Sequence, residues 1–183
     1  MPLNISMNVK HLHIEASSYC NARCPGCPRN AYGYPLKGFY NEAHLQPERL
    51  SEILEKFPNV KSILYCGNHG DPMMNPDIVG LCTNDKDISI ATNGGIGRID
   101  DYVRLADTGT HITFGIDGLE DTNHLYRQGV KGPNLMKRVE TFISAGGQAT
   151  WQFIRFKHNM DQVDQAKSLS SCLLYTSDAA DDV

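Results

Sequence analysis

Short apolar runs alternate along this chain with longer segments in which apolar residues recur at helical spacing. The apolar runs predict five strands, over 10–15, 62–66, 87–91, 111–116 and 148–156. The other segments predict helices over 47–57, 76–82, 100–106, 135–145 and 162–169. Because a helix follows each strand, the strands are expected to run parallel in a series of βα units. The pattern therefore predicts an α/β fold, and five units in line indicate a barrel or a partial barrel.

The helix expected over 135–145 carries a clear amphipathic pattern. Its apolar residues Leu135, Val139, Phe142 and Ile143 fall on one face of a helix. Two glycines follow directly and predict its C-terminal end.

Composition and charge limit the classes of protein to which the chain can belong. Of its 183 residues, 40% are hydrophobic and 21% charged, which is typical of a globular domain rather than a disordered chain. The net charge is −4 and lysine and arginine form no block, which argues against nucleic acid or an anionic membrane surface as partner. No apolar stretch approaches the length of a membrane span, and residues 1–10 lack the layout of a signal peptide. We therefore expect one cytoplasmic domain with reduced cysteines and neither a nucleic-acid nor a membrane partner.

Three cysteines, Cys20, Cys24 and Cys27, follow the first predicted strand. Three thiolates without a fourth ligand nearby suit an iron–sulfur cluster that leaves one iron open to chemistry. A structural zinc site needs four ligands, and a bacterial ferredoxin motif spaces its cysteines more closely and adds a fourth. Cys66 and Cys82 fall on a predicted strand and helix and are expected to be small buried hydrophobic residues.

The preceding strand, the cysteine spacing and the ending Cys-Pro-Gly-Cys-Pro-Arg-Asn resemble the radical S-adenosylmethionine (SAM) superfamily. The resemblance extends over about residues 9–170. It implies that Cys20, Cys24 and Cys27 each bind one iron of a 4Fe–4S cluster, and that SAM binds the fourth iron. An electron passed through the cluster would cleave SAM to a 5′-deoxyadenosyl radical that abstracts hydrogen from a substrate. The chain departs from the family at Gly26, where a bulky residue usually packs near the adenine.

Two further motifs follow successive predicted strands. Gly70-Asp71-Pro72 resembles the family's Gly-Glu-Pro-like motif, which implies that this turn receives the amino group of SAM. Thr92 and Asn93 match a Thr-Asn-Gly motif that faces the SAM ribose or the substrate. Each tripeptide alone is also a common turn signal, so their positions after neighbouring strands carry the inference.

The last two strands contribute the remaining candidates for cofactor binding. Asp117 ends the fourth strand and resembles the Ser-x-Asp-Gly motif of SPASM- and twitch-type members, with Gly115 in place of the serine. Arg127 matches an arginine that meets the SAM carboxylate or ribose, although a surface salt bridge is the alternative. Ile154 matches an apolar residue that packs against adenine. Which of the two alternating sets of side chains on this strand points inward stays open, and no residue is assigned as catalytic.

The resemblance also implies a domain organisation. The family core is a partial TIM-like barrel of six βα units, so the chain lacks the sixth and leaves its fifth strand as an edge. Residues 172–182 resemble a translated sequencing adapter, and a genuine acidic tail is the alternative. We expect an incomplete core domain over 1–171 and a non-native tail over 172–183. The loop over 30–44 is expected either to cover the cluster side of the barrel or to be an ordinary surface loop.

Function follows from the same resemblance. We expect a radical SAM enzyme of SPASM- or twitch-like type, with a peptide or protein as substrate, and leave open whether this length of chain is active alone. A low-potential donor of flavodoxin or ferredoxin type would supply the electron. The alternatives are a small-molecule synthase or activating enzyme of the same superfamily, and a non-catalytic iron–sulfur or zinc-binding module.

Overall fold

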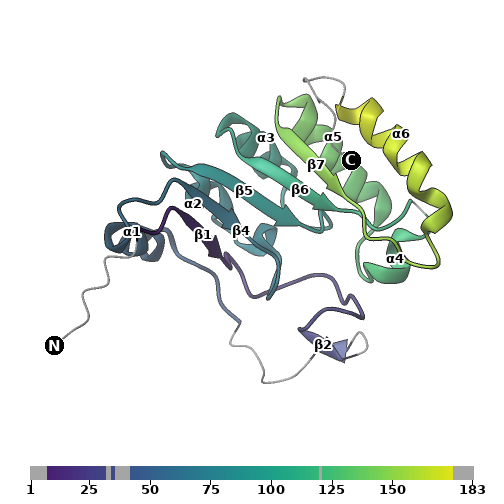
Figure 1. Ribbon diagram of the computed structural model, residues 1–183, viewed down its shortest axis with the longest axis horizontal. Coiled ribbons are helices and arrows are strands. Elements are labelled where there is room, and N and C mark those ends of the chain that lie inside the picture. The colour runs from purple at the N-terminus through teal and green to yellow at the C-terminus, as the bar shows by residue number, and fades with distance from the viewer. Residues whose placement is uncertain (1–7, 32–33, 36–41, 120, 175–183) are drawn as a thin grey trace.

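The structure is a computed structural model that describes residues 8–31, 34–35, 42–119 and 121–174. Five parallel strands form one sheet in the order β1-β4-β5-β6-β7 (Figure 1). The strands are β1 (His11–Ile14), β4 (Ser62–Tyr65), β5 (Asp87–Thr92), β6 (His111–Gly115) and β7 (Gln148–Gln152). The helices are α1 (Pro47–Lys56), α2 (Ile78–Cys82), α3 (Ile99–Asp107), α4 (Asn123–Tyr126), α5 (Gly132–Ser144) and α6 (Val163–Leu174). A small hairpin, β2 (Asn30–Ala31) with β3 (Tyr34–Pro35), and two 3-10 turns, Pro72–Met74 and Met160–Gln162, complete the described elements.

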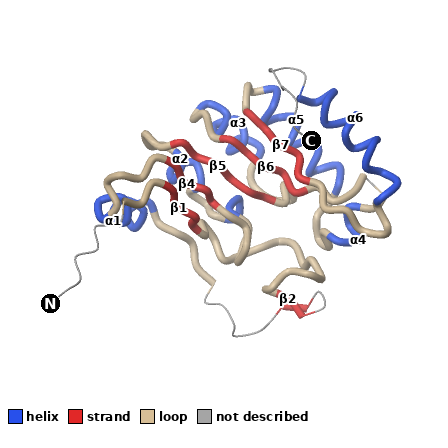
Figure 2. Tube along the Cα trace, viewed as in Figure 1, coloured by secondary structure: helices blue, strands red, loops and turns tan. Residues whose placement is uncertain are grey.

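The strand order equals the chain order, which is the arrangement that successive βα units produce. In the part of the chain that the structure describes, β1 and β7 each pair with one neighbour only, so the sheet is open at both edges. Helices cover one face of the twisted sheet, and the other face is left open (Figures 1 and 2). The predicted α/β class and partial TIM-like barrel with five βα units are therefore confirmed.

Residues alternate between the two faces of the sheet, as the geometry of a strand requires. Ile63, Tyr65, Ile90, Ile112 and Phe114 are fully buried under the helices. The predicted apolar face of α5 is buried as well, and Phe142 of that face meets Phe114 edge-on with ring centroids 6.1 Å apart. The hydrophobic core thus lies between sheet and helices and leaves the opposite face free.

The fifth strand is shorter than predicted and ends at Gln152. Beyond that residue, backbone N–H groups donate hydrogen bonds to side chains instead of to a neighbouring strand. The N–H of Ile154 donates to Asp117 Oδ1 at 2.8 Å, and the N–H of Phe156 donates to Asn159 Oδ1 at 2.6 Å. Asn159 Nδ2 in turn donates to the carbonyls of Asp117 and Ile154. The chain therefore leaves the sheet at the point where the cavity begins.

The C-terminal helix begins within the segment predicted for it, at Val163, and continues past residue 169. Helix α6 runs to Leu174, and Leu173 packs against the hydrophobic core. Residues 175–183 lie outside the described residues, as does most of the loop over 30–44. The division into a domain over 1–171 and a non-native tail stays a prediction. None of the helices within the described residues is both long and apolar enough to cross a membrane.

Candidate cofactor site

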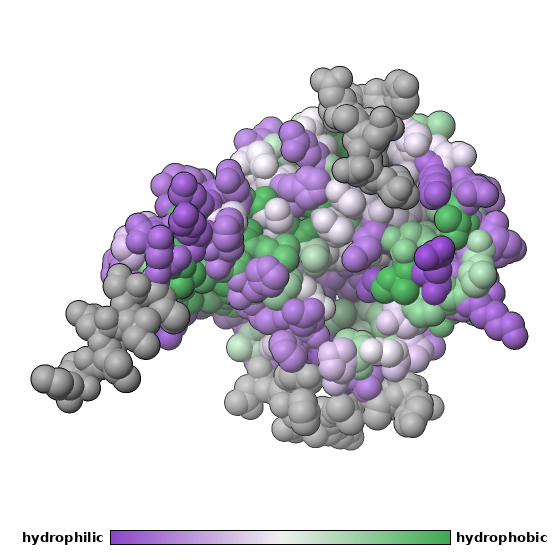
Figure 3. All heavy atoms as spheres, in the orientation of Figure 1, coloured by the Kyte–Doolittle hydropathy of each residue, from purple (hydrophilic) through white to green (hydrophobic). Residues whose placement is uncertain are grey.

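A cavity of about 470 Å³ opens at the carboxyl ends of the strands. Figure 3 shows a hollow near the centre of the open face, between the strands and the segment that leads to β2. The volume falls within the range of about 300–1,000 Å³ in which proteins bind small molecules and cofactors. The cavity is lined by all but two of the predicted site residues: Cys20, Cys24, Cys27, Gly70, Asp71, Thr92, Asn93, Arg127 and Ile154. The exceptions, Pro72 and Asp117, are buried behind its wall.

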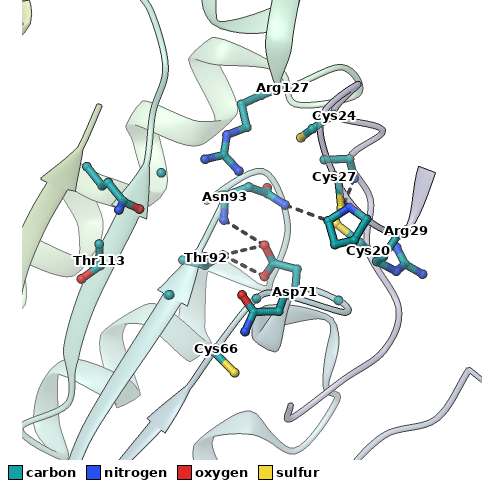
Figure 4. A pocket seen from close by; sticks show the side chains of 18 of the residues that line it. Cys20, Cys24, Cys27, Arg29, Cys66, Asp71, Thr92, Asn93, Thr113 and Arg127 are labelled. Carbon is teal, nitrogen blue, oxygen red and sulfur yellow. Dashed lines mark hydrogen bonds between the residues drawn. The ribbon is translucent and has the colours of Figure 1, made fainter. Parts of the chain in front are cut away.

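The three cysteines stand on one side of this cavity (Figure 4). Backbone hydrogen bonds shape their loop, since the N–H of Cys27 donates to the Cys24 carbonyl at 3.0 Å. The N–H of Arg23 donates to the Gln128 carbonyl at 2.8 Å, which ties the loop to the segment after α4. Asn93 Nδ2 lies 3.7 Å from Cys20 Sγ. All three thiols are free of disulfide bonds.

Burial controls the electrostatics of two of these thiols. Desolvation, with a contribution from nearby Asp71, raises the pKa of Cys20 to about 11. Desolvation also raises the pKa of Cys24, while the guanidinium of Arg127 opposes that shift. Because metals bind the thiolate, an iron centre would have to displace protons from these groups.

No group of three His, Cys, Asp or Glu side chains in the described ranges is arranged to hold a single metal ion.

Asp71 organises the side of the cavity that faces the cysteines. Its carboxylate accepts hydrogen bonds from Thr92 Oγ1 at 2.8 Å and from the backbone N–H of Asn93 at 2.8 Å. Asn93 Nδ2 also donates to Asn21 Oδ1 at 3.0 Å. Burial raises the pKa of Asp71, although these donors oppose the shift. The carboxylate thus joins the ends of β4 and β5 to the cysteine loop, a connection that the separate motifs did not reveal.

Gly70 allows the cysteine loop to approach this turn closely. A Cβ at position 70 would overlap the carbonyl oxygen of Ser17, and the N–H of Asp71 donates to the Tyr19 carbonyl at 2.7 Å. A glycine permits such a close backbone approach, and the backbone of Ser17 is the neighbour here.

We expect Gly70→Ala to lower the free energy of unfolding by about 3 kcal/mol, because the overlap is with backbone that cannot move aside cheaply. Gly109→Ala is the matched control, since Gly109 has a φ of +73° but nothing within 4 Å of a Cβ. Backbone strain alone costs it about 1 kcal/mol. Urea unfolding of the iron-free proteins, followed by circular dichroism, measures both. Equal midpoints for the two variants would contradict the close-packing argument.

Arg127 reaches the cavity because a buried carboxylate holds it. Its Nε donates to Asp117 Oδ2 at 2.6 Å, and the Asp117 side chain is 0% exposed. Burial opposes the charge of Arg127, but Asp117 outweighs it and the pKa of the guanidinium stays above its usual value. A Cβ at Gly115 would lie 2.6 Å from Arg127 Nη2, so the glycine in place of serine makes room for this guanidinium. Asp117 positions Arg127 rather than facing the cavity itself.

Comparison with known proteins decides the family. A model of the radical SAM superfamily matches residues 14–154, which is most of the chain. The chain belongs to the radical SAM superfamily. No curated protein sequence matches it.

Solved structures of radical SAM proteins share the fold. SuiB of Streptococcus suis superposes with a TM-score of 0.72 at 19% identity, over 89% of this chain and 37% of that one. The protein anSMEcpe with bound AdoMet (SAM) gives 0.65 at 16% identity, over 87% of this chain and 45% of that one. Methylornithine synthase PylB superposes with a TM-score of 0.56 at 15% identity, over 79% of this chain and 44% of that one. At such identities the likeness concerns the fold, and this chain spans less than half the length of each.

Radical SAM proteins use a 4Fe–4S cluster and SAM, and the residues of this cavity fit that pair. Three thiols share one wall, and the cations Arg29 and Arg127 lie beside them to balance the negative charge of thiolates and of a carboxylate. The volume leaves room for a nucleoside and an amino-acid moiety.

Cys66 is buried, as the sequence predicted, but it also lines the cavity and lies just after the end of β4. Its thiol lies on the cavity wall and donates to Glu15 Oε1 at 3.2 Å, and in Figure 4 it stands apart from the other three cysteines. Burial, helped by Glu15, raises the pKa of Cys66 to about 11. Cys82 is buried in the hydrophobic core, as expected.

The structure decides which side chains of β7 point inward and adds cavity residues that the sequence did not indicate. Gln152 and Ile154 line the cavity, whereas Trp151 faces the helices and donates from Nε1 to the Ile116 carbonyl at 2.8 Å. The lining residues that sequence reasoning missed include His13, Arg29, Cys66, Thr113, Tyr126 and Gln152. The polar residues on the strands carried a weak signal, because they alternate with buried apolar ones. Tyr126 carried none, since α4 has only four residues and no periodicity.

Proposed function

We propose that this chain is the cofactor-binding core of a radical SAM enzyme, in which Cys20, Cys24 and Cys27 each hold one iron of a 4Fe–4S cluster. One observation carries the proposal: the three cysteines and the motifs at the ends of the neighbouring strands surround a single cavity of cofactor size. Cys66 also faces that cavity, but its thiol donates to Glu15, which argues against a role as a fourth ligand.

The other cavity residues would bind SAM through complementary charge and polarity. Arg127 offers a guanidinium to the SAM carboxylate, and Asp117 keeps it charged and oriented. The Gly70-Asp71 turn offers backbone carbonyls to the ammonium group, while Pro72 starts the 3-10 turn behind it. Thr92 and Asn93 place hydroxyl and amide groups near the ribose, and Ile154 offers an apolar surface.

When bound, the cluster and SAM supply a one-electron reductive cleavage that releases methionine and a 5′-deoxyadenosyl radical, which removes a hydrogen atom from a substrate C–H bond. The electron would come from a low-potential donor of flavodoxin or ferredoxin type. The residues of this chain hold the reacting groups in place and keep them within a partly closed cavity. We place this core at residues 1–171 and expect it in the cytoplasm.

A peptide is the substrate class that the cavity supports best. The cavity wall offers hydrogen-bonding groups from His13, Asn68, Thr113 and Gln152, which suit amides. No helix covers this face of the sheet (Figure 1), and the hollow lies on it (Figure 3), so an extended chain has access. The protein anSMEcpe, one of the structural neighbours, has been solved with bound AdoMet and a peptide. A SPASM- or twitch-like type agrees with such a substrate, while a small-molecule synthase remains the rival.

Anaerobic reconstitution with iron and sulfide tests the activity. We expect SAM to change the paramagnetic spectrum of the dithionite-reduced cluster, and 5′-deoxyadenosine to accumulate. The variant with Cys20, Cys24 and Cys27 all replaced by alanine should show neither effect. Bound zinc in place of iron, or a reduced cluster whose spectrum does not change when SAM is added, would point instead to a non-catalytic module.

Hydrogen abstraction also tests the substrate class. Peptide and metabolite fractions from cells grown in deuterated medium are added separately to the reconstituted protein. A peptide substrate predicts deuterium in the 5′-deoxyadenosine with the peptide fraction alone. Transfer from the metabolite fraction alone would favour the small-molecule synthase.

A further inference from the structure

Gly26 leaves an empty place in the cysteine loop, and the ring of Tyr126 lies against it. A Cβ at position 26 would meet Tyr126 Oη at 3.2 Å and Cε2 at 3.7 Å. Both residues line the cavity. The lack of a side chain at position 26 is therefore matched by an aromatic ring that arrives from α4, about a hundred residues later in the chain.

Aromatic and cationic neighbours hold the ring of Tyr126 in place. It packs on Phe156 with ring centroids 4.3 Å apart, and Phe156 stacks on His158 at 5.4 Å. The guanidinium carbon Cζ of Arg127 lies over the Tyr126 ring, 5.6 Å from its centroid, in a cation–π contact. Helix α4 itself is anchored by buried Asn123, whose Oδ1 accepts from the N–H of Asp117 at 2.9 Å. This packing fixes the ring at the cavity wall before any ligand binds.

Among the described residues that line the cavity, Tyr126 is the single Phe, Tyr or Trp. Purine rings gain affinity by stacking on aromatic side chains. The remaining lining combines polar and charged side chains with thiols, alanines and glycines, and Leu64 and Ile154 are its larger apolar side chains.

We propose that Tyr126 supplies the aromatic surface against which the adenine of SAM packs, in place of a side chain at position 26. The assignment rests on the proposed function, because it presupposes that this cavity binds SAM. Position 26 is then a glycine because a bulky side chain there would collide with Tyr126. The φ of Gly26 is not in the left-handed region, so its backbone permits a side chain and only the ring opposes one.

A side-chain swap tests the assignment on the anaerobically reconstituted chain, with SAM affinity measured by calorimetry. Tyr126→Ala should weaken SAM binding by about 10-fold to 100-fold, as loss of base stacking does. Tyr126→Phe keeps the ring and should stay within about 3-fold of the unmodified protein. Gly26→Tyr should weaken binding through the collision. Gly26→Tyr combined with Tyr126→Ala should recover most of the affinity.

Two controls separate stacking from damage to the fold. Leu125→Ala alters the neighbouring residue of α4, which is 46% exposed, and should leave SAM binding unchanged. Free methionine lacks the adenine, so its effect on the spectrum of the reduced cluster should be the same with and without Tyr126→Ala. Iron content is measured for every variant, and Tyr126→Leu replaces Tyr126→Ala if the latter loses iron.

The possible failures are distinct. If the unmodified protein binds iron but not SAM, the proposed function itself is wrong. If it binds SAM and Tyr126→Ala (or Leu) binds it equally well, Tyr126 has no part in adenine recognition. If the swapped double variant binds no better than Tyr126→Ala, the two positions do not substitute for each other and the proposal is overturned.

Discussion

Replacement of Cys20, Cys24 or Cys27 by serine is expected to reduce bound iron from about four atoms per chain to less than one. Each cysteine would hold a different iron, so two remaining thiolates cannot retain the cluster against loss to solvent. All three side chains line the cavity, and none is engaged in a disulfide bond that a substitution would break. Iron and sulfide analysis, with the absorbance of the anaerobically reconstituted proteins, measures the loss.

Cys66 and Cys82 provide the matched controls for this experiment. Cys66→Ser keeps a donor for Glu15 on the same cavity wall, and Cys82→Ala removes a thiol that is buried in the hydrophobic core. Both should retain the full iron content, although Cys82→Ala should unfold more easily by about 1 kcal/mol. Iron loss in Cys66→Ser as severe as in the other three would reassign the ligand set.

Asp117→Asn is expected to lower the free energy of unfolding by about 3–5 kcal/mol, because it leaves the buried guanidinium of Arg127 without its counter-charge. The Arg127 side chain is only 18% exposed and Asp117 is 0% exposed, so water screens the pair little. Asparagine can still accept from the N–H of Ile154 through Oδ1, but its amide nitrogen takes the place of Oδ2 and cannot accept from Arg127 Nε, so the counter-charge and one hydrogen bond are lost together. Denaturant unfolding of the iron-free protein measures the effect, and SAM affinity should fall as well, since Arg127 loses its orientation.

The same substitution in an ion pair whose cation is exposed is the control, although the Asp101 side chain itself is only 6% exposed. Asp101 accepts from Arg98 through both carboxylate oxygens, at 2.9 and 2.8 Å, but the Arg98 side chain is 68% exposed. Asp101→Asn should therefore cost about 1 kcal/mol or less. If Asp117→Asn and Asp101→Asn shifted unfolding equally, the pair with Arg127 would be as well solvated as a surface pair, and its positioning role would be lost.

The sequence alone determined the order and kind of the main elements and the face that α5 buries. These depend on the period with which apolar residues recur, and burial of one face imposes that period locally. The three cysteines and the motifs after successive strands could also be recognised, because parallel strands bring their carboxyl ends to one edge of a sheet. Resemblance then supplied the family, which the match over residues 14–154 confirms.

Tertiary structure decided what depends on contacts between distant segments. The early end of β7 follows from Asn159 and Asp117, which lie 42 residues apart in the chain and share a hydrogen bond. The position of Asp117 behind Arg127, of Cys66 on the cavity wall and of Tyr126 over Gly26 likewise depends on the packing of one loop against another. Such contacts leave no periodic trace in the sequence, because a loop residue is selected for its partner across space and not for its neighbours along the chain.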